Sequence, residues 1–405
     1  MRTYFWVAVL LVTALPVRGE SVNSLSQAYA MAWQRQPVAQ AALERQTALQ
    51  ARRSAVDSLT PEPPSIELAG RTDRWNNDRG ATEQEVGLVV PLWLFGERSG
   101  SQALADAEIG ALDGRMAALR LQLAGEVREA WWGWQLASNE RALTAQRVTS
   151  ATRLRDDVAR RVAAGDLSRA DQHQAEGALA SALAEQAEIE SALLNAEFRL
   201  KSLIGVLPAE VGIVAEPAVD SKSSPVASEQ HPALRELQTR SDVSRRSLDL
   251  ARTRTRNNPE IAIATRRERS VSNEPMDQTW AIALRIPFSS GARTDARIAE
   301  ANADLIETTL QYERARERVG NERSSADARL AAARKQLAAN EDRARLAVES
   351  RSFFEKSFRL GETDLPTRLR IELEAFQAER QATRARINLA QSISAYRQAL
   401  GLLPE

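Results

Sequence analysis

The chain consists of two copies of one long unit, and this duplication constrains its fold more than any other feature of the sequence. Proline and glycine recur at a nearly constant offset: Pro37 and Pro232 lie 195 positions apart, and Gly165 and Gly361 lie 196 positions apart. Solenoid repeats are only roughly 20–50 residues long, so the sequence predicts two large, equivalent halves. The matched pairs are Pro37/Pro232, Pro64/Pro259, Pro91/Pro287, Gly165/Gly361, Gly205/Gly401 and Pro208/Pro404.

The duplication divides the chain into four segments. Residues 1–19 read as a signal peptide, because an apolar stretch from Phe5 to Val17 precedes a cleavage-site pattern at residues 17–19. A membrane anchor is the alternative, but the stretch is shorter than the ~20 residues of a spanning helix. The first repeat covers residues 20–210 and the second covers residues 229–405, with a proline- and serine-rich linker at 211–228.

Each half contains one region with two segments in which apolar and polar residues alternate. This region lies at about 64–91 in the first half and at about 259–288 in the second. This period of two is typical of strands with one apolar face, and the polar residues between the segments predict hairpin turns. Strands of about ten residues suit a tilted crossing of a bilayer, although alternation also fits a hairpin on a water-soluble core. The residues expected to face lipid are Ile66, Leu68, Val86, Leu88, Val90, Ile261, Ile263, Trp280, Ile282, Leu284 and Ile286.

Long helices are expected around the hairpins. A first helix is expected to begin at a cap formed by Ser24 or Ser26, to continue past Pro37 and to end before Pro61. Helical pairs follow at about 96–204 and about 291–401. The first member of each pair is a proline-free run of roughly 65 residues, or about 100 Å at the rise of an α-helix. Only 5% of the residues are aromatic, and such a composition favours long helices side by side. We expect Trp131, Trp132 and Trp134 to contribute to this packing.

The turns within the two helical pairs carry matched capping residues. Gly165 and Gly361 are placed to end the long helices in a left-handed conformation. Three residues later, Ser168 and Asp364 are suitable N-caps for the return helices. Asp171 stands three residues after Ser168, where its carboxylate completes a capping box.

The composition excludes several classes of function. The chain has no Cys, two His, and equal numbers of basic and acidic residues. Disulfides, thiolate metal sites and lipid attachment to Cys are therefore excluded, and no basic field favours nucleic acid. No nucleophile, phosphate-loop or zinc motif is present. We expect no catalytic residues, no bound metal and no cofactor, so the chain is not expected to be an enzyme.

The hairpins indicate assembly with other copies. Four strands are too few to close a barrel, and unpaired strand edges cannot face lipid. Three copies would supply twelve strands, a number within the range of outer-membrane barrels. The expected fold class is mainly α with a small membrane β part. Long antiparallel coiled-coil helices form an α-barrel, and two hairpins contribute four strands to a trimeric twelve-stranded β-barrel.

Almost the whole chain resembles the TolC-like outer-membrane efflux family. The resemblance lies in the duplication, in the spacing of Leu25, Ala28, Ala32 and Pro37, in Pro91 and Pro287 after each hairpin, and in the Gly165 and Gly361 turns. It implies a homotrimeric channel in bacterial outer-membrane lipid with a large periplasmic part. Such a channel is the exit duct of a tripartite pump and docks a periplasmic adaptor (membrane fusion) protein and an inner-membrane efflux transporter. The short hairpin loops are similar to the heavy-metal branch, which makes metal ions one candidate cargo.

The resemblance also implies a periplasmic entrance at the start of the return helices. The matching positions are Asp171, Thr367 and Arg370. Asp171 fits the acidic ring of the family, whereas Thr367 and Arg370 depart from it, and an arginine ring would disfavour cations. The alternative is that Asp171 only caps a helix and Arg370 is a solvated side chain.

Two other functions remain open from the sequence. A periplasmic coiled-coil adaptor or scaffold would explain the helices and the export, but not hairpins at equivalent places in both halves. An exported enzyme would need a convergent polar site, and the sequence contains no such set. The duct is therefore the favoured interpretation.

Overall fold

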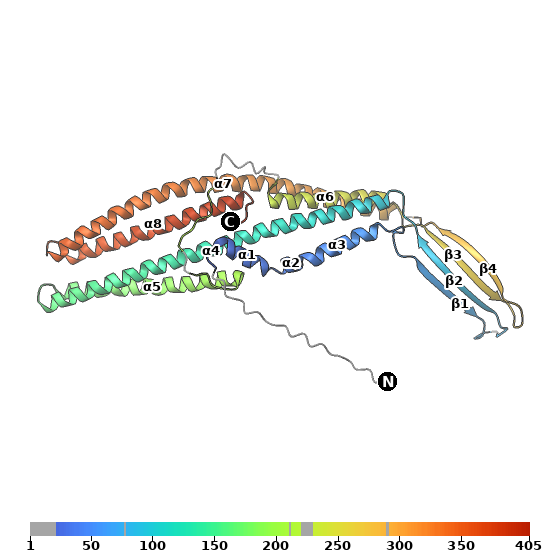
Figure 1. The fold of residues 1–405 in the computed structure, drawn as a ribbon, viewed down its shortest axis with the longest axis horizontal. Coiled ribbons are helices and arrows are strands. Elements are labelled where there is room, and N and C mark those ends of the chain that lie inside the picture. Colours follow the sequence, from blue (N-terminus) through green and yellow to red (C-terminus); the bar gives the residue numbers. More distant parts are fainter. Residues whose placement is uncertain (1–21, 77, 210–211, 220–229, 289–290) are drawn as a thin grey trace, which may run out of the picture.

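A computed structural model describes residues 22–76, 78–209, 212–219, 230–288 and 291–405. The predicted signal peptide lies outside these residues, as does part of the predicted linker. The elements in chain order (Figure 1) are α1 (Leu25–Gln34), α2 (Pro37–Gln40), α3 (Ala42–Val56), β1 (Ser65–Thr72), β2 (Thr82–Pro91), α4 (Glu97–Ala163), α5 (Arg169–Ile204), α6 (Pro232–Thr253), β3 (Glu260–Arg269), β4 (Asp277–Arg285), α7 (Gly291–Arg359) and α8 (Leu365–Ala399).

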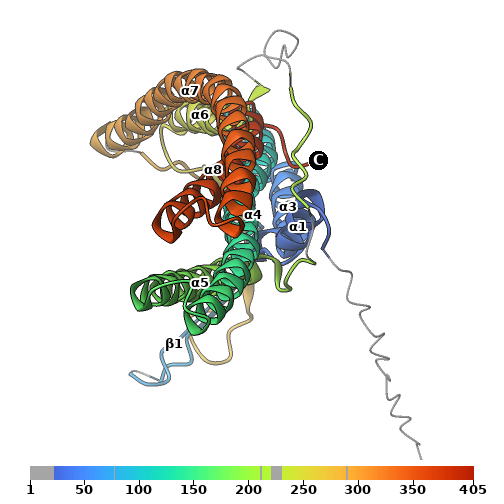
Figure 2. The ribbon, with the colours of Figure 1, turned by 90° about the vertical axis from the view of Figure 1, so that its left-hand side faces the viewer.

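The helices lie along one direction, with the sheet at one end and the α4–α5 and α7–α8 turns at the other (Figure 1). The long helices α4 and α7 have 67 and 69 residues. Viewed end-on, α7, α8, α4 and α5 form a curved layer, with α1 and α3 against one side of it (Figure 2). The expected class, mainly α with a small β part, is confirmed.

No helix in the described parts of the chain has both the length and the apolar composition needed to cross a membrane.

The first helix is not continuous, so this expectation was wrong. α1 ends at Gln34, and Gln36 has an extended backbone (φ −71°, ψ 126°) before Pro37 begins α2. Proline has no N–H to donate to a preceding turn, and its ring disfavours a helical residue before it. The helix is interrupted again at Ala41, and α3 ends at Val56, before Pro61 as expected.

The largest apolar core lies midway along the helices, where α1 packs on α4. Trp131, Trp132 and Trp134 are almost fully buried there, as expected. Ala28 and Ala32 of α1 have no exposed surface, because alanine lets two helices approach closely. Trp132 also donates a hydrogen bond from Nε1 to the Ser394 hydroxyl of α8 at 2.9 Å. This core therefore joins the first half of the chain to the second.

The two hairpins form one antiparallel sheet in the order β1-β2-β3-β4. β2 of the first half pairs with β3 of the second over ten residue pairs, from Thr82 with Arg269 to Pro91 with Glu260. The strands keep a continuous register, so the faces predicted from each strand add up across the sheet. Among the described residues, β1 and β4 each pair with one strand only.

Candidate functional site

The apolar strand residues lie on one face of the sheet. Directly paired residues in adjacent strands point to the same side, and the register sets these residues in rows across the sheet. Ile286 follows the last residue of β4. The rows are Val90, Ile261 and Leu284; then Ile66, Leu88, Ile263 and Ile282; then Leu68, Val86, Thr265 and Trp280.

This face is largely uncovered by the rest of the chain. Ile66 is 71% exposed and Ile282 is 80% exposed, although both belong to residue types that are normally buried. A monomeric protein in water rarely exposes a continuous apolar surface of this kind, and such surfaces mark contacts with membranes or other proteins. The sheet therefore has one face and two edges that require a partner.

The opposite face is polar and carries ion pairs between strands. Arg266 lies 3.1 Å from a carboxylate oxygen of Glu83 and 3.0 Å from one of Glu85. Near the other end of the sheet, Arg285 lies 3.1 Å from Glu260. One side of the sheet is thus suited to water and the other to an apolar medium.

At the far end of the helices, α4 stops in a Schellman turn. Gly165 has φ +85°, and its N–H donates to the carbonyl of Val162 at 3.0 Å. The next N–H, of Asp166, donates to the carbonyl of Arg161 at 2.9 Å. The left-handed conformation costs glycine little because it has no Cβ.

The return helix α5 begins with the predicted capping box. The Ser168 hydroxyl accepts a hydrogen bond from the Asp171 N–H at 3.2 Å, and the Asp171 carboxylate accepts from the Ser168 N–H at 2.9 Å. The Asp171 carboxylate is therefore used in capping its own helix.

The second copy of this turn differs in its capping. Gly361 has φ +80°, and the Asp364 carboxylate accepts a hydrogen bond from the Thr367 N–H at 3.1 Å. Hydrogen bonds from the hydroxyl and the N–H of Thr367 hold the pKa of the Asp364 carboxyl below its usual value. Arg370 is exposed and lies 3.3 Å from Glu374. Within the described chain, no hydrogen bond or ion pair connects Asp171 with Thr367 or Arg370.

The two helical pairs contact each other near these turns. Phe358 of α7 is buried in a small apolar cluster with Leu154 and Val158 of α4 and Leu365 of α8. The guanidinium carbons of Arg161 and Arg368 lie 5.1 and 4.7 Å from the centroid of its ring. The quadrupole of an aromatic ring attracts a cation that lies over its face. This contact therefore connects α4 and α8 to the end of α7.

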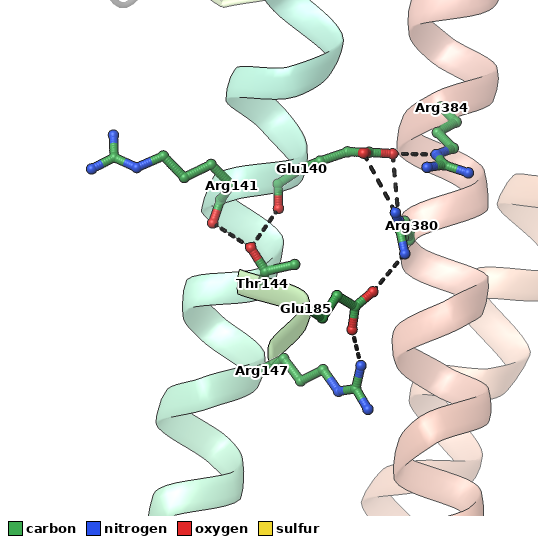
Figure 3. Close-up of polar contacts among 7 residues, drawn as sticks. All are labelled: Glu140, Arg141, Thr144, Arg147, Glu185, Arg380 and Arg384. Atoms are coloured by element: carbon green, nitrogen blue, oxygen red, sulfur yellow. Dashed lines mark hydrogen bonds and ion pairs between the residues drawn. The ribbon is translucent and has the colours of Figure 1, made fainter. Parts of the chain in front are cut away.

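A charged network connects the helical pairs farther from the turns (Figure 3). Glu140 of α4, whose side chain is only 7% exposed, is bound by Arg384 and lies 3.4 Å from Arg380, both of α8. Arg380 also lies 2.6 Å from Glu185 of α5, which pairs in turn with Arg147 of α4. Burial raises the pKa of Glu140, but hydrogen bonds from Arg384 and Arg380 outweigh it and hold the pKa below its usual value.

Sequence reasoning did not identify this network. Glu140 and Arg384 are 244 positions apart, and neither belongs to a motif. One signal was available: Arg380 lies 195 positions after Glu185, next to the position equivalent to Glu185, because the offset of the duplication is 196 in the return helices.

Comparison with known proteins shows which proteins this chain is similar to. Residues 28–206 match the family model "Outer membrane efflux protein". Members of that family are passive channels rather than enzymes. No curated protein matches the sequence.

Solved structures share the fold over nearly the whole chain. A membrane protein from Pseudomonas aeruginosa has a TM-score of 0.76 and 20% identity, covering 94% of this chain and 91% of its own. CusC, whose crystal structures concern folding and transmembrane channel formation, has a TM-score of 0.78 and 15% identity. The match covers 94% of this chain and 93% of CusC. VceC, an outer membrane protein of Vibrio cholerae, has a TM-score of 0.74 and 15% identity, with 94% and 97% covered.

The matched residues comprise most of the first half, and the second half repeats their order of helix, hairpin and paired long helices. Residues 28–206 therefore belong to the outer membrane efflux protein family, and the whole chain has the fold of the channel structures that it matches.

Proposed function

We propose that three copies of the chain close one twelve-stranded β-barrel in the bacterial outer membrane and continue it as an α-barrel in the periplasm. The observation that supports this is the sheet, which combines an exposed apolar face with open edges at β1 and β4. Pairing β4 of one copy with β1 of the next removes both edges. In lipid, a sheet can form all the hydrogen bonds of its backbone N–H and C=O groups only when it closes into a barrel.

In this assembly the apolar rows from Ile66 to Trp280, with Ile286, face lipid, and the polar face lines the bore. The helices, about 100 Å long by their rise per residue, carry the bore across the periplasm. With no Cys in the chain, attachment to the membrane rests on the strands rather than on a lipidated Cys.

The duct serves as the exit of a tripartite efflux pump. The turns at Gly165, Ser168, Gly361 and Asp364 form its periplasmic tip, which meets a periplasmic adaptor protein and an inner-membrane transporter. Asp171, Thr367 and Arg370 are the entrance residues of this proposal. The cargo is passively conducted, with metal ions as one candidate.

Channel formation tests the proposal. Protein with its N-terminal 19 residues removed is added to planar bilayers, and the assembly is followed by heat-modifiable migration in gels. We expect a trimer and stable conductance from the wild type. Ile282→Arg places a charge on the apolar face and should abolish insertion, because a charge on the lipid side costs about 2–4 kcal/mol at the midplane.

Ala281→Arg is the matched control, since it puts the same side chain next along β4 but on the polar face. This variant should insert and conduct. A water-soluble wild-type monomer without conductance would contradict the proposal and favour a periplasmic scaffold. Equal insertion of both variants would contradict the assignment of the faces.

A further inference from the structure

Charge is distributed very unequally between the two faces of the sheet. The polar face has six acidic strand residues and three arginines, whereas the apolar face has no acidic residue and two arginines, Arg267 and Arg269. The charged residues of the polar face are Glu67, Arg71, Glu83, Glu85, Glu260, Arg266, Glu268, Asp277 and Arg285.

Both arginines of the apolar face lie at one end of it. The apolar rows stop at Thr265 and Trp280, and the next row places Arg267 between Gln84 and Gln278. Arg269 follows two positions later, about 7 Å along the strand. These positions adjoin the hairpin turns, at the end of the sheet away from the helices (Figure 1).

Neither arginine is neutralised within the described chain. Arg267 is exposed and donates to the Gln278 amide oxygen at 3.4 Å, and Arg269 donates to the carbonyl of Gly80 at 3.1 Å. Neither lies within ion-pair distance of a carboxylate in the described residues, whereas Arg71, at the same height on the polar face, lies 3.5 Å from Glu83. The two guanidinium groups thus form a positive patch at the rim of an apolar surface.

We propose that Arg267 and Arg269 bind the phosphate groups of an anionic lipid in the outer leaflet of the outer membrane. This inference rests on the proposed function, which puts the apolar face in lipid and the hairpin turns outside. Guanidinium groups form paired hydrogen bonds with phosphate oxygens, and the amides of Gln84 and Gln278 add neutral donors in the same row. Each copy of the trimer then carries one such site.

The experiment measures lipid binding to the intact channel. The detergent-solubilised trimer is titrated with lipid A that carries both phosphates and with the same lipid after dephosphorylation, and native mass spectrometry counts the bound molecules. We expect the phosphorylated lipid to bind with a stoichiometry of one per copy. Arg267→Gln with Arg269→Gln should weaken its binding roughly thirtyfold, since each cation near an anionic surface contributes about a factor of five.

Arg71→Gln with Arg285→Gln is the matched control, because it removes two arginines from the polar face of the same sheet. This variant should bind the phosphorylated lipid as the wild type does. Equal affinity for the dephosphorylated lipid, or unchanged binding by the apolar-face variant, would overturn the inference. Inorganic pyrophosphate that binds as tightly as the lipid would also overturn it, because the site would then be one for free phosphate.

Conductance of the same preparations in planar bilayers separates the two proposals. A wild type that conducts but fails the lipid test leaves the channel function intact and removes only the lipid site. A wild type that never inserts refutes the channel function itself.

Discussion

Arg128 of α4 binds the carboxylate of Glu216, which lies in the segment after α5, through two hydrogen bonds. Nε donates to Oε2 at 3.0 Å, and Nη2 donates to Oε1 at 2.7 Å. Arg397 of α8 lies 3.3 Å from the same carboxylate. All three side chains are at most 5% exposed. The carboxylate therefore joins the first half of the chain, the connecting segment and the second half at one buried point.

Glu216→Gln should destabilise the helical part by about 3 kcal/mol. Removing one member of a buried charged group leaves a remaining charge without compensation. Here that charge is Arg128, because Arg397 also lies 3.0 Å from a carboxylate oxygen of Glu405. The midpoint of thermal unfolding, followed by circular dichroism in detergent, measures the effect. Glu129→Gln is the control, because the Glu129–Arg199 pair is about 60% exposed on both sides, and exposed pairs contribute about 0–1 kcal/mol. Equal midpoints for the two variants would contradict this account.

Glu140 should make the contact between the helical pairs sensitive to acid. Its pKa in the folded chain is held below the usual 4.5 by Arg384 and Arg380. A lowered pKa means that the carboxylate stabilises the fold above pH 4.5, and that this contribution is lost as the pH falls through the folded-state value. Glu140→Gln should cost about 2 kcal/mol at neutral pH and much less in acid.

The measurement is the difference in unfolding midpoint between wild type and Glu140→Gln, taken at neutral pH and again well below pH 4.5. Glu190→Gln, which changes an exposed carboxylate of α5, corrects for the other acidic groups. If the gap between wild type and Glu140→Gln stayed constant over this range, the network would have no electrostatic role.

The two glycines Gly165 and Gly177 should respond oppositely to alanine. Both have open space where a Cβ would stand, but Gly165 has φ +85° and Gly177 lies within α5. Gly165→Ala should destabilise by about 1 kcal/mol, because L-residues are strained in the left-handed region. Gly177→Ala should stabilise by up to about 1 kcal/mol through helix propensity. The measurement is the shift of the thermal unfolding midpoint from the wild-type value. Shifts in the same direction for both variants would show that the turn conformation is not the deciding factor.

The hairpins could be predicted in detail because a period of two determines the face of a strand without knowledge of its neighbours. Ile66, Leu88, Ile263 and Ile282 were each assigned to the apolar side of their own strand, and the register then aligned them in one row. The glycine turns were equally predictable, since the left-handed conformation at Gly165 is a local property of the chain.

The contacts between the helical pairs could not be predicted. A helix of 67 residues carries charges on every side, so the sequence does not reveal which carboxylate faces α8. Glu140 looks like any solvated residue until the second half of the chain places Arg384 beside it. The break before Pro37 is a different case, because a proline restricts the residue before it and is visible in the sequence. The expectation gave more weight to the apolar stripe of Ala28 and Ala32 than to this local effect.

Arg370 provides the test of the entrance. In the proposed trimer three copies of this residue surround the bore at the tip, and three positive charges disfavour the passage of cations. Within the described residues the exposed guanidinium forms an ion pair with the exposed Glu374 at 3.3 Å, so it is available to the bore. Arg370→Ala should therefore shift the reversal potential in a salt gradient towards cation preference, and Arg370→Lys should retain the wild-type value.

Arg345→Ala is the matched control, because Arg345 is 65% exposed against 64% for Arg370 and pairs with Asp342 on α7. Ion preference and conductance that Arg370→Ala leaves unchanged would place the entrance at other residues and leave Arg370 as a solvated side chain.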